Sequence, residues 1–261
     1  MFNNTCYRLG EIMKKLLLVS AMFVSLSASA EISLFGPGGP HVPLLEVAKN
    51  YQTMTGKEVK VYFGPQATWN EEAKAKADIL FGASEQSALA IANDHADKFD
   101  IHQIQPVYLR EAVILVKPGN PKKITGIQDL ISKDVGIVVN DGHGQSNTSG
   151  TGVWEDIVGR LANIESVSKF RNHIVLFAPN SGSARKAFLE DEKVDAWITW
   201  KDWAIANPQL GEMVEIEPEL KVYRDFNIVL KNHASVDEEA FFQFLKSDSA
   251  YQVFKKYGWF K

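Results

Sequence analysis

Several loops of the chain combine glycines with hydroxyl and amide side chains just before an expected helix. The densest is "SNTSGTGVWEDIVGR", residues 146–160, where Thr148–Gly152 run directly into an amphipathic pattern that predicts a helix over residues 151–162. The first amide groups of a helix have no partner within it, and the helix dipole places positive potential at that end. Glycines let a ligand approach the backbone closely, and hydroxyls add neutral donors. A loop of this kind is suited to binding a small anion.

Five further loops share this composition, and each follows an apolar run that predicts a strand. The runs are "ISLF", "VKVYF", "DILF", "HIVLFA" and "DAWIT". Ligands of open parallel sheets bind beyond the carboxyl ends of the strands, so we expect these loops to meet at one edge. The candidate ligand-binding residues are Gly38, Gly39, Gln66, Thr68, Trp69, Ser84, Glu85, Arg110, Thr148, Ser149, Gly150, Thr151, Ser181, Gly182, Ser183, Arg185 and Trp200.

Charged candidates refine this prediction. Arg185 falls in the first turn of an expected helix, where the helix dipole disfavours a cation, and this favours a functional role. Arg110 lies in β-rich sequence and is a second candidate for a charge-assisted clamp, although a surface or interface position is an alternative. Glu85 is expected to disfavour a ligand with excess negative charge.

Each candidate also has a simpler structural interpretation. The hydroxyl residues can be helix N-caps, and the glycine loops can be tight turns. Trp69, Trp200 and Trp203 can be packing residues, and we expect Lys201 and Asp202 to be solvated. The pattern is therefore more specific as a set than at any single position.

No catalytic or metal-binding constellation accompanies these loops. His143 stands near Asp141, but the sequence has no His-x-x-x-His pair, no His-Glu-x-x-His motif, no nucleophile elbow and no Walker loop. Cys6 is the only cysteine of the chain. We therefore predict a protein that is not an enzyme and that carries no cofactor or metal.

The N-terminus predicts export. Lys14 and Lys15 precede an apolar stretch that ends in "SASA", which is typical of a cleaved signal peptide over residues 1–30. Residues 1–12 are a candidate upstream extension, because "MKKLLLVS" from Met13 is how such signals open. An uncleaved anchor is the alternative. The chain has a net charge of −4 and no basic patch, which argues against nucleic acid as a partner.

Strand and helix patterns alternate along the rest of the chain, and this predicts an α/β protein with parallel sheets. We expect two lobes: lobe 1 comprises residues 31–112 plus 225–261, and lobe 2 comprises residues 113–224. Two β-rich segments, near 107–117 and 221–231, cross between the lobes and are expected to form a hinge.

The segments "ISLFGPGGPH", "VYFGPQATW", "ILFGASEQS", "YLREAVILVKPGNPK" and "SGTGVWED" resemble the type II periplasmic solute-binding proteins. Within them they are similar to the accessory colonization factor AcfC branch and its adhesin-like surface antigens. The resemblance covers essentially all of the chain after residue 30. It implies a two-lobed fold like that of molybdate- and sulfate-binding proteins.

The same resemblance implies a periplasmic or cell-surface protein that holds an oxyanion, a carboxylate or a phosphorylated metabolite between its lobes. It also implies a role in colonisation, a membrane permease or a host-surface receptor as partner, and a homodimer in some members. Trp200 stands near a position where the oxyanion binders place a tyrosine. The alternative function is a surface antigen or adhesin whose ligand cleft is secondary.

Overall fold

The computed structural model describes residues 31–142 and 149–261, so the expected signal peptide, His143 and Thr148 lie outside the described residues. Residues Glu31–Lys261 form one compact unit. The helices of eight residues or more are α2 (His41–Thr55), α4 (Glu85–Asp94), α7 (Ile164–His173), α8 (Ser181–Glu190), α10 (Val236–Phe244) and α11 (Asp248–Lys256). The shorter ones are α3 (Asn70–Lys76), α5 (Ile127–Ser132), α6 (Val153–Gly159) and α9 (Lys201–Ala206).

The strands join into one nine-stranded sheet across the described residues, in the order β2-β1-β3-β9-β4-β7-β5-β6, with β8 paired to β4. Their bounds are β1 (Ile32–Gly36), β2 (Val59–Phe63), β3 (Ile79–Gly82), β4 (Gln105–Val116), β5 (Ile137–Asn140), β6 (Ile174–Ala178), β7 (Ala196–Trp200), β8 (Glu212–Val214) and β9 (Tyr223–Leu230). Strands β1, β2 and β3 are parallel to one another, as are β5, β6 and β7. The carboxyl ends of each parallel set therefore meet at one edge.

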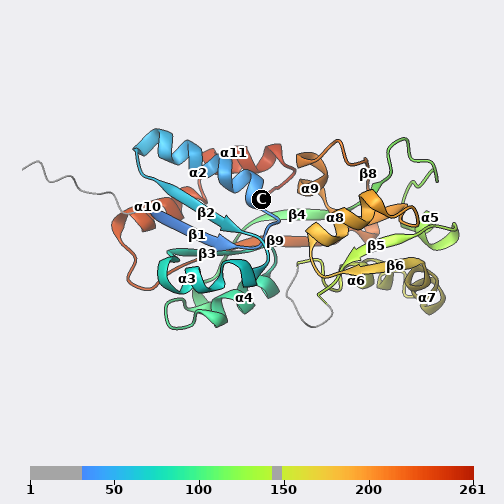
Figure 1. Ribbon diagram of the computed structural model, residues 1–261, viewed down its shortest axis with the longest axis horizontal. Helices are drawn as coiled ribbons and strands as arrows, with labels where there is room; N and C mark the ends of the chain where they lie inside the picture. The colour runs from blue at the N-terminus through green and yellow to red at the C-terminus, as the bar shows by residue number, and fades with distance from the viewer. Residues whose placement is uncertain (1–30, 143–148) are drawn as a thin grey trace, which may run out of the picture. The chain divides into compact units, whose positions relative to one another are not determined.

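In lobe 1 the strands are buried on both faces because helices cover both. Leu34 and Phe81 pack toward α2, α10 and α11, whereas Phe35 and Leu80 pack toward α3 and α4. Figure 1 shows α2 and α11 on one side of these strands and α3 and α4 on the other. This explains the nearly continuous apolar runs, which are typical of parallel strands covered on both faces.

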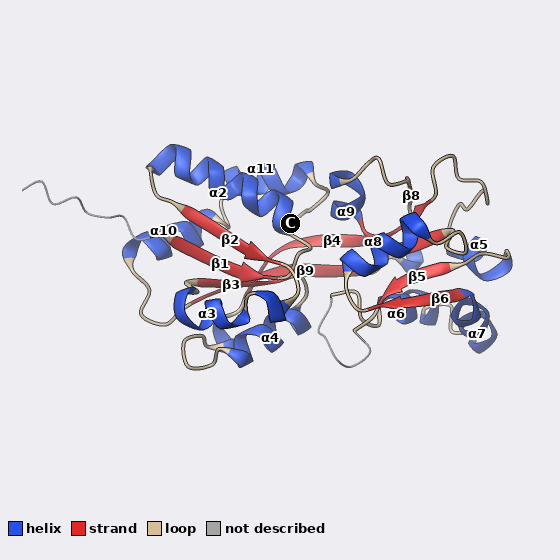
Figure 2. Cartoon of the chain, viewed as in Figure 1, coloured by secondary structure: helices blue, strands red, loops and turns tan. Residues whose placement is uncertain are grey.

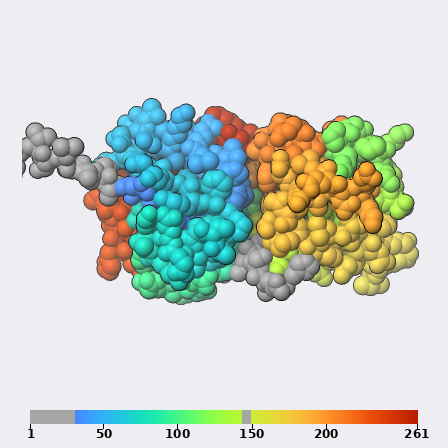
Figure 3. Space-filling model, viewed as in Figure 1, coloured from blue at the N-terminus to red at the C-terminus, as the bar shows by residue number. Residues whose placement is uncertain are grey.

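Lobe 2 repeats this arrangement. Val139 and Ile198 face α5, α6 and α7, and Val138 and Trp197 face α8. In the space-filling view, the blue-to-green atoms of lobe 1 and the yellow-to-orange atoms of lobe 2 gather at opposite ends (Figure 3). Each lobe thus has its own core.

The two crossing segments are β4 and β9, which pair antiparallel with each other. Strand β4 pairs with β9 up to Glu111 and with β7 from Ala112 onward. Figure 2 shows both as long strands that connect the two sets of parallel strands. The crossover predicted for residues 107–117 is thus found as a strand shared by both sets, while the lobe boundaries themselves stay a prediction.

The helix expected over residues 151–162 is wrong in its extent. Helix α6 begins at Val153 after Gly152, whose φ of 73° is left-handed, and it ends at Gly159. A separate helix, α7, follows, and Asn163 caps it by accepting a hydrogen bond from the Ser166 amide (2.9 Å). Ala162, at φ 49°, breaks the chain direction between them.

Candidate ligand site

The Arg110 guanidinium lies where loops from the two lobes meet. Its Nη2 donates to the Ala83 carbonyl oxygen (3.0 Å), in the loop between β3 and α4, and to Ser149 Oγ (2.8 Å), in the loop between β5 and α6. Nη1 donates to both carboxylate oxygens of Asp202, at 3.2 Å each, in the first turn of α9. One side chain therefore joins a lobe 1 loop to two lobe 2 segments.

The pair of Arg110 and Asp202 is fully buried, at 0% and 2% side-chain exposure. Burial lowers the pKa of Arg110 and raises the pKa of Asp202, and the attraction between the two charges opposes both shifts. The expectation that Asp202 is solvated is wrong, because its carboxylate is the counter-ion of this guanidinium. Lys201 is half-buried and bonds to Glu111 and Glu215 instead.

The loop between β1 and α2 abuts the same guanidinium. A Cβ atom added at Gly39 would lie 2.9 Å from Arg110 Nη1, so only glycine fits here without a shift. A Cβ atom at Gly38 would lie 3.8 Å from the Cα of Gly64, which begins the loop after β2. Two more of the predicted loops are thereby neighbours at this edge.

The N-terminus of α4 is already occupied by groups of the protein itself. Ser84 caps the helix in a capping box with Ser87, which confirms the predicted helix start. The Glu85 amide donates to Asp225 Oδ1 (2.9 Å), a carboxylate on the crossing strand β9. Burial and then the neighbouring Asp225 raise the pKa of the Glu85 carboxyl. This end of the site is therefore rich in negative charge.

In lobe 2, Asn140 ties two predicted loops together. It ends β5, and its Nδ2 donates to Ser181 Oγ (3.0 Å) at the start of α8. Its Oδ1 accepts a hydrogen bond from Trp197 Nε1 (2.8 Å). A Cβ atom at Gly150 would lie 2.4 Å from Asn140 Cβ, so the loop before α6 packs directly on this residue. Thr151 Oγ1 accepts a hydrogen bond from the Gly142 amide (3.2 Å) and closes the loop.

The N-terminus of α8 differs from that of α4 in charge. Asn180 is its cap and accepts from the Ser183 amide (2.9 Å), so Ser183 supplies a capped backbone amide, and Gly182 is exposed. The first turn has no acidic residue. Arg185 is the fifth residue of α8 and so lies just beyond the first turn where we expected it; among the described residues, no hydrogen bond or ion pair is found for its partly exposed guanidinium. The α8 end is therefore the more positive end of the candidate site.

The structure gives other contacts to the candidates after β2. Gln66 Nε2 donates to Asn70 Oδ1 (3.2 Å) and Asp94 Oδ2 (2.6 Å), and Thr68 Oγ1 donates to the Pro65 carbonyl (2.7 Å). Trp69 is buried against Phe35, and its Nε1 donates to the Gly64 carbonyl (3.2 Å). These side chains hold their own loop in place, as the packing interpretation proposed.

Trp200 is buried too, and its ring centre lies 4.4 Å from the Arg110 guanidinium carbon. Trp259 covers the same guanidinium at 5.0 Å. Sequence reasoning did not select Trp259, Asn140 or Asp202 as site residues. An asparagine that ends an apolar strand was a usable signal for Asn140, whereas the other two depend on contacts across the fold.

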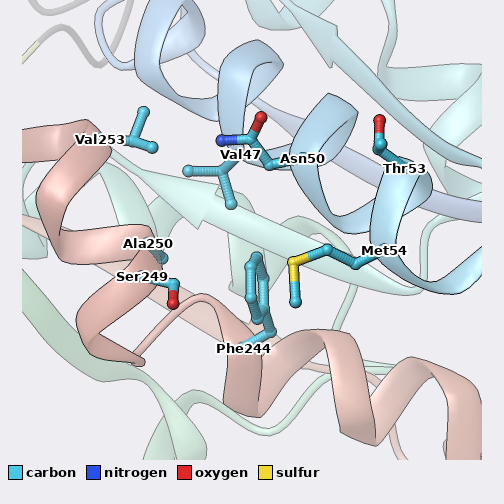
Figure 4. A pocket seen from close by; sticks show the side chains of 8 residues that line it. All are labelled: Val47, Asn50, Thr53, Met54, Phe244, Ser249, Ala250 and Val253. Atoms are coloured by element: carbon cyan, nitrogen blue, oxygen red, sulfur yellow. The ribbon is translucent and has the colours of Figure 1, made fainter.

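Of the hollows found in the described residues, one beside α8 is lined by the candidate Ser183 together with Lys186 and Glu190, and two others are lined by no candidate. One of these two, of about 250 Å³, lies between α2, α10 and α11, and Figure 4 shows Met54 and Phe244 at its floor with Asn50, Thr53 and Ser249 around it. In residues 31–142 and 149–261, no group of three or more histidine, cysteine, aspartate or glutamate side chains is placed to hold a metal ion. No helix within those ranges has the length and apolar character needed to cross a membrane.

Comparisons with known proteins identify the family and the fold. Residues 32–260 match the model of a family described as bacterial extracellular solute-binding protein. A search of curated proteins returned no match. Among solved structures, PEB3 from Campylobacter jejuni is 54% identical, with a TM-score of 0.85 over 88% of this chain and 99% of that one.

A structure of PEB3 with L-phospholactate bound is 55% identical, with a TM-score of 0.86 and the same coverage. The periplasmic molybdate-binding protein of Azotobacter vinelandii is 14% identical, with a TM-score of 0.67 over 88% of this chain and 99% of that one, and shows the shared fold. The two-lobed α/β fold predicted from the sequence is confirmed. The chain belongs to the family of bacterial extracellular solute-binding proteins.

Proposed function

We propose that this protein captures a small anion between its two lobes, and that the anion is a carboxylate with a phosphate or hydroxyl group. The observation that carries the proposal is the junction at Arg110, where Ala83 of lobe 1 and Ser149 of lobe 2 bond to one side chain. Loops that follow parallel strands in both lobes are thereby held together, as a ligand between the lobes requires.

The donors available at this junction suit an anion. Ser149, Thr151 and Ser181 supply neutral hydroxyls, and Arg185 supplies a cation for which no partner is found among the described residues. Glu85 and Asp225 stand on the α4 side and disfavour a second full charge there. We therefore propose that the more charged group of the ligand, such as a phosphate, lies on the α8 side.

The chemistry of a relative supports the same class. PEB3, at 55% identity, has been crystallised with L-phospholactate, a three-carbon acid with one phosphate. Export through residues 1–30 fits this function, as do a permease or receptor partner and a dimer. A role in colonisation is compatible with it.

A thermal-shift screen tests the proposal. L-phospholactate, phosphoglycerate, phosphate, citrate, sulfate and molybdate are added in turn, and a bound ligand raises the melting temperature by mass action. We expect the phosphorylated acids to give the largest rise. Replacing Ser149 and Thr151 together with alanine should remove the rise, and it should also lower the ligand-free melting temperature because Ser149 Oγ accepts a hydrogen bond from the buried Arg110. A full rise in this double variant would show that the site lies elsewhere.

A further inference from the structure

We propose that Arg110 is a positioning residue rather than a ligand contact, and that the C-terminal residue Trp259 sets its position. Through these two side chains, the C-terminal segment controls the order of residues 149–152, directly before α6. The effect of this device on ligand affinity rests on the proposed function, whereas its effect on the loop does not.

Burial and partner count argue against direct contact between Arg110 and a ligand. The side chain is 0% exposed, and both of its terminal nitrogens already donate to oxygen atoms of the protein. Its Nε is buried and has no partner within the described residues. A ligand oxygen would have to displace Ser149 or Ala83 to reach Nη2. The guanidinium therefore acts on the site by positioning the loops that contain Ala83 and Ser149.

Three groups fix the guanidinium in turn. Asp202 supplies the opposite charge, and the rings of Trp200 and Trp259 lie 4.4 and 5.0 Å from the guanidinium carbon, within cation–π range. Gly39 leaves room for Nη1 that any side chain would fill. Only Trp259 among these groups belongs to the C-terminal segment.

Trp259 is held at this position by the backbone. The next residue, Phe260, exchanges two hydrogen bonds with Leu109, at 2.7 and 2.9 Å, so the tail runs beside β4 directly next to Arg110. Trp259 also packs on Phe226 of β9 and Phe254 of α11. The C-terminal segment therefore contacts both crossing strands, β4 and β9, and also packs on the Arg110 guanidinium. A shift of either strand would move Trp259 relative to this guanidinium.

Hydrogen–deuterium exchange on the ligand-free protein tests the proposal, with Trp259→Leu, Trp259→Phe and Phe260→Leu as the variants. We expect Trp259→Leu to raise exchange about tenfold in peptides that cover residues 149–157, with α7 as the internal reference for global unfolding. Trp259→Phe retains an aromatic ring over the guanidinium and should restore protection. Phe260→Leu is the matched control, because Phe260 packs on Tyr223 and not on Arg110.

A Gly39→Ala variant keeps the test valid if Trp259→Leu does not fold. Its methyl group would meet Nη1 from the opposite loop and should raise exchange in the same peptides. The proposal is overturned if both variants leave exchange over residues 149–157 unchanged relative to α7.

Calorimetry with L-phospholactate then measures the consequence for binding. Trp259→Leu should raise the Kd about tenfold, while the Kd of Phe260→Leu should stay within about twofold of that of the original protein. If the original protein does not bind L-phospholactate, the proposed ligand class is wrong, and the exchange result still decides the role of Arg110. Equal Kd values for the two leucine variants would refute the coupling.

Discussion

Replacing Asn140 with aspartate separates the electrostatics of the site from its packing. Asn140 Nδ2 lies 3.0 Å from Ser181 Oγ, and an anion bonded to that hydroxyl would place its oxygen about 2.7 Å further on. Asn140→Asp would therefore set a negative charge about 5–6 Å from the ligand. At an effective dielectric constant of about 20, the repulsion is about 3 kcal/mol for each unit of ligand charge. For a single unit of ligand charge, the Kd should therefore rise about a hundredfold.

Asn140→Ala is the matched control, because it removes the amide without adding charge. It leaves Trp197 Nε1, on a side chain with 0% exposure, without its 2.8 Å acceptor, which costs about 1–3 kcal/mol of stability. Asn140→Asp keeps an acceptor for this group, but its carboxylate also accepts the Ser181 hydroxyl hydrogen bond that the ligand would use, which adds to the loss of affinity. We expect the alanine variant to lose stability and keep most of its affinity, whereas the aspartate variant loses affinity.

Calorimetry with L-phospholactate and urea denaturation of both variants check this pair of outcomes. The repulsion scales with ligand charge, so the affinity lost by Asn140→Asp should be larger for a phosphorylated acid than for a monoanion. If Asn140→Asp binds L-phospholactate within about threefold of the original protein, the anion does not lie at the α8 end, and the reasoning from Ser181 is refuted.

Three further predictions concern charged groups of the site. Arg185→Gln should weaken L-phospholactate binding about tenfold or more, as measured by calorimetry. Lys186→Gln, at the exposed next residue, is the control and should leave binding unchanged. Equal losses of affinity in the two variants would show that Arg185 is not part of the site. Asp202→Ala should lower the free energy of unfolding, measured by urea denaturation, by about 3–5 kcal/mol because it leaves Arg110 buried without a counter-ion. Asp156→Ala breaks the exposed pair with Arg224 and should lower it by at most about 1 kcal/mol. The raised pKa of Glu85 means that its ionised form opposes folding above its folded pKa and has no effect below its ordinary pKa of 4.5. Glu85→Gln should therefore raise the ligand-free melting temperature slightly at pH 7 and leave it unchanged near pH 3.5, and a rise of the same size at both pH values would contradict this assignment.

The apolar pattern was sufficient to predict the fold class and most elements. Strands covered on both faces are short continuous apolar runs, whereas helices with one apolar face repeat their apolar residues about every 3.6 positions. An amphipathic pattern over about residues 248–256 predicts helix α11, which spans Asp248–Lys256, since apolar residues such as Val253 and Phe254 are a local signal. The division between α6 and α7 was missed because Ala162 adopts a left-handed conformation, and an alanine gives no sequence signal of such a turn as a glycine would.

The candidate site was predictable as a set of loops but not as a network of contacts. Composition and position after strands selected Gly150 and Ser181, which the structure places against Asn140, and Ser149, which it places on Arg110. Burial of Asp202 and the approach of Trp259 to Arg110 join residues far apart in the chain, and no local pattern carries such information. Trp69 was selected by the same local pattern, although its type and position suited a core residue equally well. The structure buries its side chain against Phe35.

The charges on β4 and α9 run in opposite order. Arg110 and Glu111 on the strand pair with Asp202 and Lys201 on the helix, and Lys221 joins Glu111 just before β9. A slip of β4 by one residue in either direction would bring Arg110 toward Lys201 or Glu111 toward Asp202, so like charges would meet. The order of these charges therefore favours the observed register of β4 over a register shifted by one residue.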